Sequence, residues 1–131
     1  MYKHFRIVLL AVASVTFLQT GAQKKSPQFK VIAFYTERND LAHISFVHEA
    51  NKWFPKVAAQ YNFVYDSTND WSKLNTDSLS KYQVVLFLDT RADMPEQREA
   101  FQKYMENGGA WMGFHFAGFA LNHSDFPQNW D

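Results

Sequence analysis

The chain has 131 residues, carries 13 basic and 13 acidic side chains, and contains no cysteine. Without cysteine it can form neither a disulfide nor a thiolate metal site. The basic residues are scattered rather than gathered into a stripe, so we expect no nucleic-acid partner. Hydrophobic residues make up 47% of the chain, which is enough for the core of one domain.

The first residues have the three parts of a secretory signal peptide. Lys3, His4 and Arg6 form a positive segment, residues 7–18 form an apolar run, and the small residues at 20–22 favour cleavage after Ala22. The apolar run is shorter than the roughly 20 residues that span a membrane comfortably. We therefore expect residues 1–22 to be removed and the protein to be periplasmic or secreted, with no membrane contact after cleavage.

Residues 23–28 form a polar junction, after which strand-like and helix-like segments alternate. Residues 47–61 have helical spacing of their apolar side chains, and Pro55 is expected to kink this helix or to divide it. A polar loop is expected over 67–76. The apolar runs that predict buried strands cover 30–35, 62–66, 83–88 and 110–114.

Two further helices complete the alternation. A short one is predicted over 77–82. A longer one is predicted from Asp93 to Asn107, with Asp93 as its cap, Pro95 in its first turn and Gly108 as its left-handed stop. Strands joined by helical crossovers favour parallel pairing. We therefore expect an α/β fold, a flavodoxin-like doubly wound parallel sheet in which the first strand lies between the second and the third.

In such a sheet, ligands bind beyond the carboxyl ends of the strands, where the strand order reverses. The predicted order places this point between the first and third strands. The polar residues that leave the strand ends there are Thr36, Glu37, Arg38, Asn39, Asp40, His43, Asp89, Thr90, Arg91, Asp93 and, after the fourth strand, His115.

The segment from Gly113 to Ala117 is the most informative motif in the chain. A small residue on each side of a central polar residue, directly after a buried strand, is typical of the sharp elbow that presents a catalytic nucleophile. The central residue here is His115 rather than Ser or Cys, so acyl transfer loses its usual nucleophile. In the alternative interpretation, Gly113 permits close packing and His115 is a hydrogen-bonded loop residue.

We predict that His115, His43 and Asp89 are catalytic. We predict that Thr36, Arg38 and Thr90 contact the ligand. Alternatives are open, because Asp89 could pair with Arg91 and His43 could simply begin a helix. His48 and His123 are expected on the surface or in loops. A divalent metal on His43, His115 and a carboxylate is possible, but no ligand spacing specifies one, and no cofactor is defined.

The chain resembles the trehalose-utilisation (ThuA-like) family, which has the class I glutamine-amidotransferase-like fold. The matching segments are residues 30–43, 82–93 and, most specifically, 101–115. The resemblance implies a role in carbohydrate utilisation and an elbow with His115 where glutaminases have cysteine, so glutamine hydrolysis is not expected. Family members often continue His-Ala-Ala-x-Asp, whereas this chain reads His-Phe-Ala-Gly-Phe from His115, without the acidic residue.

The family domain is longer than this chain, so residues 29–131 are expected to be the N-terminal part of a truncated ThuA-like domain. Two functions are compatible with these features. One is an enzyme that acts on a disaccharide or sugar derivative, with His115 as general acid and base or as a metal ligand, and with His43 and Asp89 completing the site. The alternative is a non-catalytic carbohydrate-binding or partner domain. Both imply a small-molecule sugar partner, and neither predicts an oligomeric state.

Overall fold

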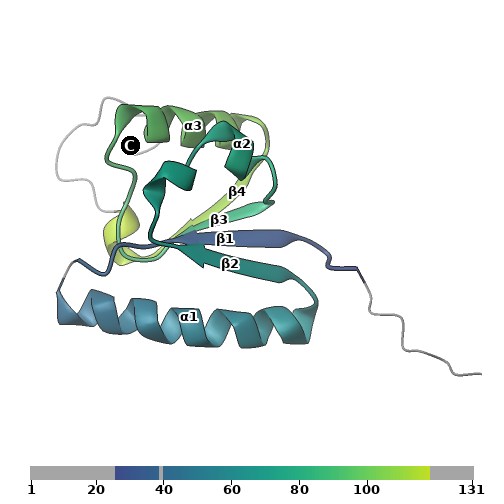
Figure 1. The fold of residues 1–131 in the computed structure, drawn as a ribbon, viewed down its shortest axis with the longest axis vertical. Coiled ribbons are helices and arrows are strands. Elements are labelled where there is room, and N and C mark those ends of the chain that lie inside the picture. The colour runs from purple at the N-terminus through teal and green to yellow at the C-terminus, as the bar shows by residue number, and fades with distance from the viewer. Residues whose placement is uncertain (1–25, 39, 119–131) are drawn as a thin grey trace, which may run out of the picture.

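The computed structural model describes residues 26–38 and 40–118, and within them the chain forms a four-stranded parallel sheet in the order β2-β1-β3-β4 (Figure 1). This confirms the predicted flavodoxin-like sheet. The expected signal peptide lies outside the described residues. The strands are Lys30–Phe34 (β1), Val64–Thr68 (β2), Val84–Phe87 (β3) and Ala110–Gly113 (β4).

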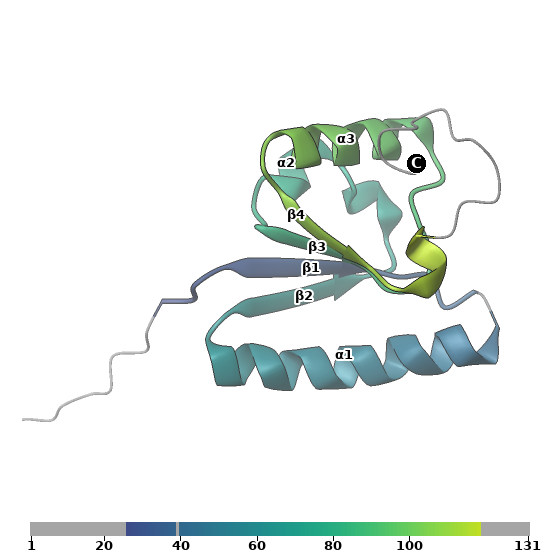
Figure 2. The same ribbon diagram turned by 180° about the vertical axis from the view of Figure 1, so that it is seen from behind.

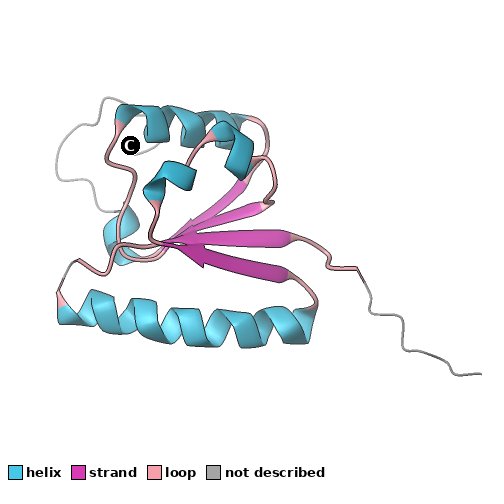
Figure 3. Ribbon diagram, viewed as in Figure 1, coloured by secondary structure: helices cyan, strands magenta, loops and turns pink. Residues whose placement is uncertain are grey.

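Helices cover both faces of the sheet. The long helix α1 (Leu41–Tyr61) lies along one face, and α2 (Thr76–Leu79) and α3 (Pro95–Glu106) lie on the other (Figures 1 and 2). The colouring by secondary structure in Figure 3 shows the sheet between these two helical layers. Two 3₁₀ turns, η1 (Trp71–Lys73) and η2 (His115–Gly118), follow β2 and β4. No helix of the described ranges is both long and apolar enough to cross a membrane.

The continuous apolar run of β1 is explained by a core on each side of the sheet. Because successive side chains of a strand point to opposite faces, Ile32 and Phe34 join the core under α2 and α3, and Val31 and Ala33 join the core under α1. The first core also contains Leu79, Val85, Phe87 and Phe101, and the second contains Val47, Ala50, Leu86 and Leu88.

The expected division of the first helix at Pro55 is wrong. Helix α1 runs through Pro55 without a break and is drawn without a sharp bend in Figure 1. Pro55 is exposed, and its missing N–H removes a single helical hydrogen bond without ending the helix. The predicted polar loop at 67–76 is also shorter than expected, because it contains η1 and the first residue of α2.

Asp93 does not cap the third helix. Met94 is the N-cap residue of α3, and its backbone N–H donates to Gln97 Oε1 at 3.4 Å. Pro95 occupies the first helical position, which proline favours, and this places the cap at the residue immediately before it. The predicted stop is confirmed, since Gly108 has a left-handed φ of 85°.

A tight turn follows β4. His115 has a φ of 44°, which is the left-handed conformation that a sharp elbow requires. A Cβ atom added at Gly113 would collide with the ring of Trp111 and lie 3.2 Å from the Cβ of Ala117. Gly113 is therefore required by close packing, and the packing holds the backbone that presents His115.

We predict that Gly113→Ala destabilises the fold by about 1–3 kcal/mol, because the Trp111 ring packs against Phe87 and Phe101 and cannot move aside without disturbing them. Urea unfolding followed by circular dichroism measures the change. Gly118→Ala is the matched control, since a Cβ there meets nothing within 4 Å. Equal stabilities for the two variants would show that the elbow is not closely packed.

Candidate functional site

The carboxyl ends of the strands lie on the left in Figure 1. Residues of these strand ends and of the segments that follow them line two clefts. The histidine cleft has a volume of about 440 Å³ and is lined by Asp40, Ala42, His43, Phe46, Leu88, Phe114 and His115. The polar cleft has a volume of about 380 Å³ and is lined by Thr36, Arg38, Asn69, Asp70, Trp71, Thr90, Arg91, Asp93, Met94 and Gln97.

The histidine cleft contains a chain of three side chains joined by hydrogen bonds. The Oδ2 atom of Asp40 lies 2.9 Å from Nδ1 of His43. The Nε2 atom of His43 lies 2.9 Å from Nδ1 of His115. The two imidazoles, 72 residues apart in the sequence, are therefore in direct contact, as the prediction of a shared rim requires.

Local structure explains how this chain of side chains forms. Asp40 is the N-cap of α1, and its Oδ1 atom accepts the backbone N–H groups of Ala42 at 2.9 Å and of His43 at 3.2 Å. His43 is the third residue of the helix, from which a side chain can fold back onto the cap. His115 approaches from the elbow after β4.

Electrostatics fix where the protons of this chain lie. The backbone N–H of His43, and then its side chain, lower the pKa of Asp40 below its usual value, so Asp40 is a carboxylate at neutral pH. A carboxylate only accepts, so the proton of neutral His43 must be on Nδ1. The Nε2 atom of His43 then accepts the Nδ1–H of neutral His115. The Nε2 atom of His115 is left with a free lone pair.

The rest of the histidine cleft is apolar. The rings of Phe46 and Phe114 lie 5.0 Å apart, centroid to centroid, and Leu88 is fully buried behind them. Phe116 contacts His43 edge to face, with the ring centroids 6.0 Å apart. An apolar wall beside a small number of oriented polar groups is typical of small-molecule sites.

The residues predicted to contact the ligand lie in the other cleft. Thr36, Arg38 and Thr90 all line the polar cleft, and none of them lines the histidine cleft. The structure therefore brings together the two predicted histidines in one place and the three predicted ligand contacts in another. Arg38 is exposed, whereas Thr36 and Thr90 are half-buried.

Asp89 lies beneath the loop that separates the clefts and lines neither of them. It is fully buried, and its carboxylate accepts hydrogen bonds from the backbone N–H of Thr36 at 2.8 Å, from the Thr36 hydroxyl at 3.0 Å and from the backbone N–H of Glu37 at 2.7 Å. Glu37 has a left-handed φ of 56°. These bonds indicate that Asp89 holds the β1–α1 loop in this strained form.

Asp40 joins the two predicted histidines in the hydrogen-bond chain, although it was not predicted as a catalytic residue. The spacing of Asp40 and His43 in the sequence could have indicated this role, since an aspartate three residues before a histidine at the start of a helix can both cap the helix and bind the imidazole. His48 is exposed as expected, and its Nε2 atom lies 3.2 Å from Glu37 Oε1. His123 lies outside the described residues.

A divalent metal would find few ligands in the described part of the chain. It contains no group of three or more His, Cys, Asp or Glu side chains placed to hold an ion. The imidazoles of His43 and His115 could supply two nitrogens, and Asp40 would then orient His43 as carboxylates orient metal-bound histidines.

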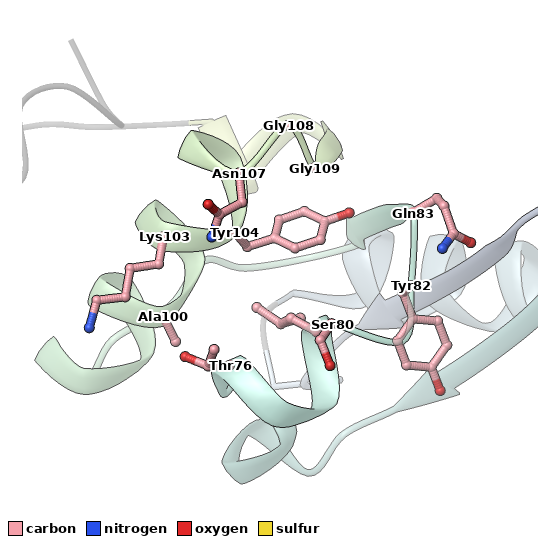
Figure 4. A pocket seen from close by; sticks show the side chains of 11 residues that line it. Thr76, Ser80, Tyr82, Gln83, Ala100, Lys103, Tyr104, Asn107, Gly108 and Gly109 are labelled. Atoms are coloured by element: carbon pink, nitrogen blue, oxygen red, sulfur yellow. The ribbon is translucent and has the colours of Figure 1, made fainter.

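A third hollow lies at the other end of the sheet, between α2, α3 and the starts of β3 and β4 (Figure 4). It has a volume of about 340 Å³. Its lining contains no histidine or carboxylate, and its charged residue, Lys103, is paired with Glu99 at 2.7 Å. It therefore offers no acid–base pair comparable to that of the histidine cleft.

We predict that Asp89→Asn destabilises the protein by about 1–3 kcal/mol, because an amide N–H₂ would face the N–H donors of the β1–α1 loop and leave buried groups unpaired. Differential scanning calorimetry measures this effect. Asp93→Asn is the control, since Asp93 is exposed. A stable Asp89→Asn protein that has lost only activity would instead give Asp89 a direct chemical role.

Comparison with known proteins agrees with this fold. Residues 30–130 match the model of the ThuA family, described as trehalose utilisation. The chain is also similar to the crystal structure of a ThuA-like protein from Bacteroides uniformis, with 38% identity and a TM-score of 0.73. That match covers 79% of this chain and 42% of the other, so this chain spans less than half the length of its structural relative. No curated protein matches it. The chain is a member of the ThuA trehalose-utilisation family.

Proposed function

We propose that this chain forms part of an enzyme that acts on a disaccharide or a sugar derivative, with His115 as the general acid and base. The observation that carries the proposal is the Asp40–His43–His115 hydrogen-bond chain in a cleft at the carboxyl ends of the strands. The substrate class is taken from the family, whose description is trehalose utilisation.

The hydrogen-bond chain suits reversible proton transfer. The free Nε2 atom of His115 takes a proton from a sugar hydroxyl or from water, and the ring becomes an imidazolium. Its Nδ1 proton can then move across the 2.9 Å contact to His43 Nε2, which places the positive charge next to the Asp40 carboxylate. When Nε2 of His115 gives its proton to the leaving group, the proton on His43 Nε2 returns to Nδ1 of His115, so both rings are neutral again and His115 has served as base and then as acid.

The elbow supports acid–base rather than thiol chemistry. The chain has no cysteine, so the position at which related glutaminases carry their nucleophile holds an imidazole instead. The adjacent apolar wall suits a sugar, because the C–H faces of a pyranose ring pack well on aromatic rings such as Phe46 and Phe114. This combination favours a sugar hydroxyl or a glycosidic oxygen as the group that exchanges the proton.

A non-catalytic carbohydrate-binding or partner domain is the second candidate. The observation that favours it is the sequence after the elbow, which places no acidic residue at 116–119. A binding domain would keep its affinity for sugars and yield no product with any of them. Product analysis on a panel of disaccharides and 3-keto-glycosides separates the two functions.

We predict that His115→Ala abolishes turnover and changes the free energy of unfolding by less than about 1 kcal/mol, because the exposed His115 side chain contributes little to the core. His43→Ala should weaken turnover less. His48→Ala is the control, since His48 is exposed and lies outside both clefts. Unfolding of the His115→Ala protein, with unchanged ligand affinity in the folded fraction, would make His115 structural.

Asp40→Asn is the companion variant that tests the proton positions. The amide oxygen can still cap α1, whereas the amide N–H₂ would donate to His43 Nδ1 and move the His43 proton to Nε2. His115 would then carry its own proton on Nε2 and could not act as a base. We expect a loss of about 10²-fold or more in kcat at neutral pH with little change in Tm, and an unchanged kcat would contradict the mechanism.

We also propose that the protein is exported, on the signal-like pattern of residues 1–22. N-terminal sequencing of protein purified from its native host should give Gln23 as the first residue. Recovery of intact Met1 on a cytoplasmic protein would rule export out.

A further inference from the structure

We propose that the polar cleft is a second saccharide subsite, so that a disaccharide places one ring in each cleft and its glycosidic link at the strand ends between them. This inference rests on the proposed function and deepens it. It assigns a binding role to Asp93 and Trp71, which line the polar cleft and lie far in sequence from the histidine pair.

The clefts are neighbours because the same two segments contribute to both. Arg38 lines the polar cleft, and Asp40, two residues later, lines the histidine cleft. Likewise, Leu88 lines the histidine cleft and Thr90 lines the polar cleft. Two residues of chain span at most about 7 Å, so at each of these two segments the backbone that lines one cleft lies within about 7 Å of the backbone that lines the other.

The polar cleft has the chemistry of a neutral polyol site. Its charged lining residues are two arginines, Arg38 and Arg91, and two aspartates, Asp70 and Asp93. The charges therefore balance, which disfavours a phosphate or another multiply charged anion. The planar guanidinium of Arg38 and the carboxylate of Asp93 can each engage two neighbouring hydroxyls, as their bidentate geometry allows.

The cleft walls are fixed before a ligand arrives. The indole N–H of Trp71 donates to the backbone carbonyl of Tyr35 at 2.9 Å, which ties η1 to the end of β1. The Gln97 side chain donates to the carbonyl of Trp71 at 3.1 Å, which ties α3 to η1. Three elements therefore hold the subsite together, and such pre-organisation reduces the entropy lost on binding.

The start of the β1–α1 loop is held as well. The bonds from Thr36 and Glu37 to the buried Asp89 anchor it directly before Arg38. Asp40 is anchored in turn as the cap of α1. A sugar ring bound by Arg38 is therefore held at a defined position relative to His43 and His115.

The test is calorimetric titration of the full chain with glucose, trehalose, maltose and cellobiose. At least one disaccharide should bind about tenfold or more tightly than glucose, because a second ring adds charge-assisted hydrogen bonds. In the Arg38→Gln and Asp93→Asn variants, the ratio of the disaccharide affinity to the glucose affinity should fall toward one. The matched controls are Lys81→Gln and Asp77→Asn, both exposed at residues outside the two clefts.

The subsite would be ruled out if glucose bound as tightly as every disaccharide. It would also be ruled out if the preference for a disaccharide over glucose were unchanged in both Arg38→Gln and Asp93→Asn. Tighter binding of glucuronate or inorganic phosphate than of the neutral sugars would contradict it as well. These results are distinct from failure of the catalytic proposal. A disaccharide preference that depends on Arg38 and Asp93, with no product formed, supports the subsite and removes catalysis. Turnover that depends on His115 but is unchanged in the Arg38 and Asp93 variants supports catalysis and rules out the subsite.

Discussion

The buried carboxylate of Asp89 is the constraint on which the geometry of both clefts depends. Its hydrogen bonds to Thr36 and Glu37 hold the chain in a left-handed turn directly after β1. Without them, the left-handed turn at Glu37 would not be fixed, because a strained turn persists only where its surroundings determine it. The same loop delivers Arg38 to one cleft and Asp40 to the other.

The second constraint is the elbow after β4, where a closely packed glycine and a left-handed His115 bring one imidazole to another. An elbow in this fold presents a side chain above the sheet, and the chemistry of that side chain is a separate matter. Replacing a thiol with an imidazole changes a covalent nucleophile into a proton carrier. The Asp40 carboxylate then selects which nitrogen of each ring carries the proton.

Strand pattern and helical spacing were enough to predict the sheet order, the elbow and the meeting of His43 with His115. Two local predictions failed at prolines. Pro95 sets the cap of α3 at Met94, and α1 continues through the exposed Pro55. The sequence pattern also predicted a single site for all polar residues of the strand ends. Their division into two clefts depends on which side of the β1–α1 loop each residue faces, and periodicity carries no information on this.

The most direct test of the account is the protonation of the two histidine rings, measured by long-range ¹H–¹⁵N NMR of the folded protein at a pH where both rings are neutral. Substituting each histidine in turn assigns the signals. We expect His43 and His115 both to carry their proton on Nδ1, with Nε2 of His115 unprotonated, because His43 Nδ1 donates to Asp40 and His115 Nδ1 donates to His43. A proton on Nε2 of His115, with its Nδ1 unprotonated, would contradict the account.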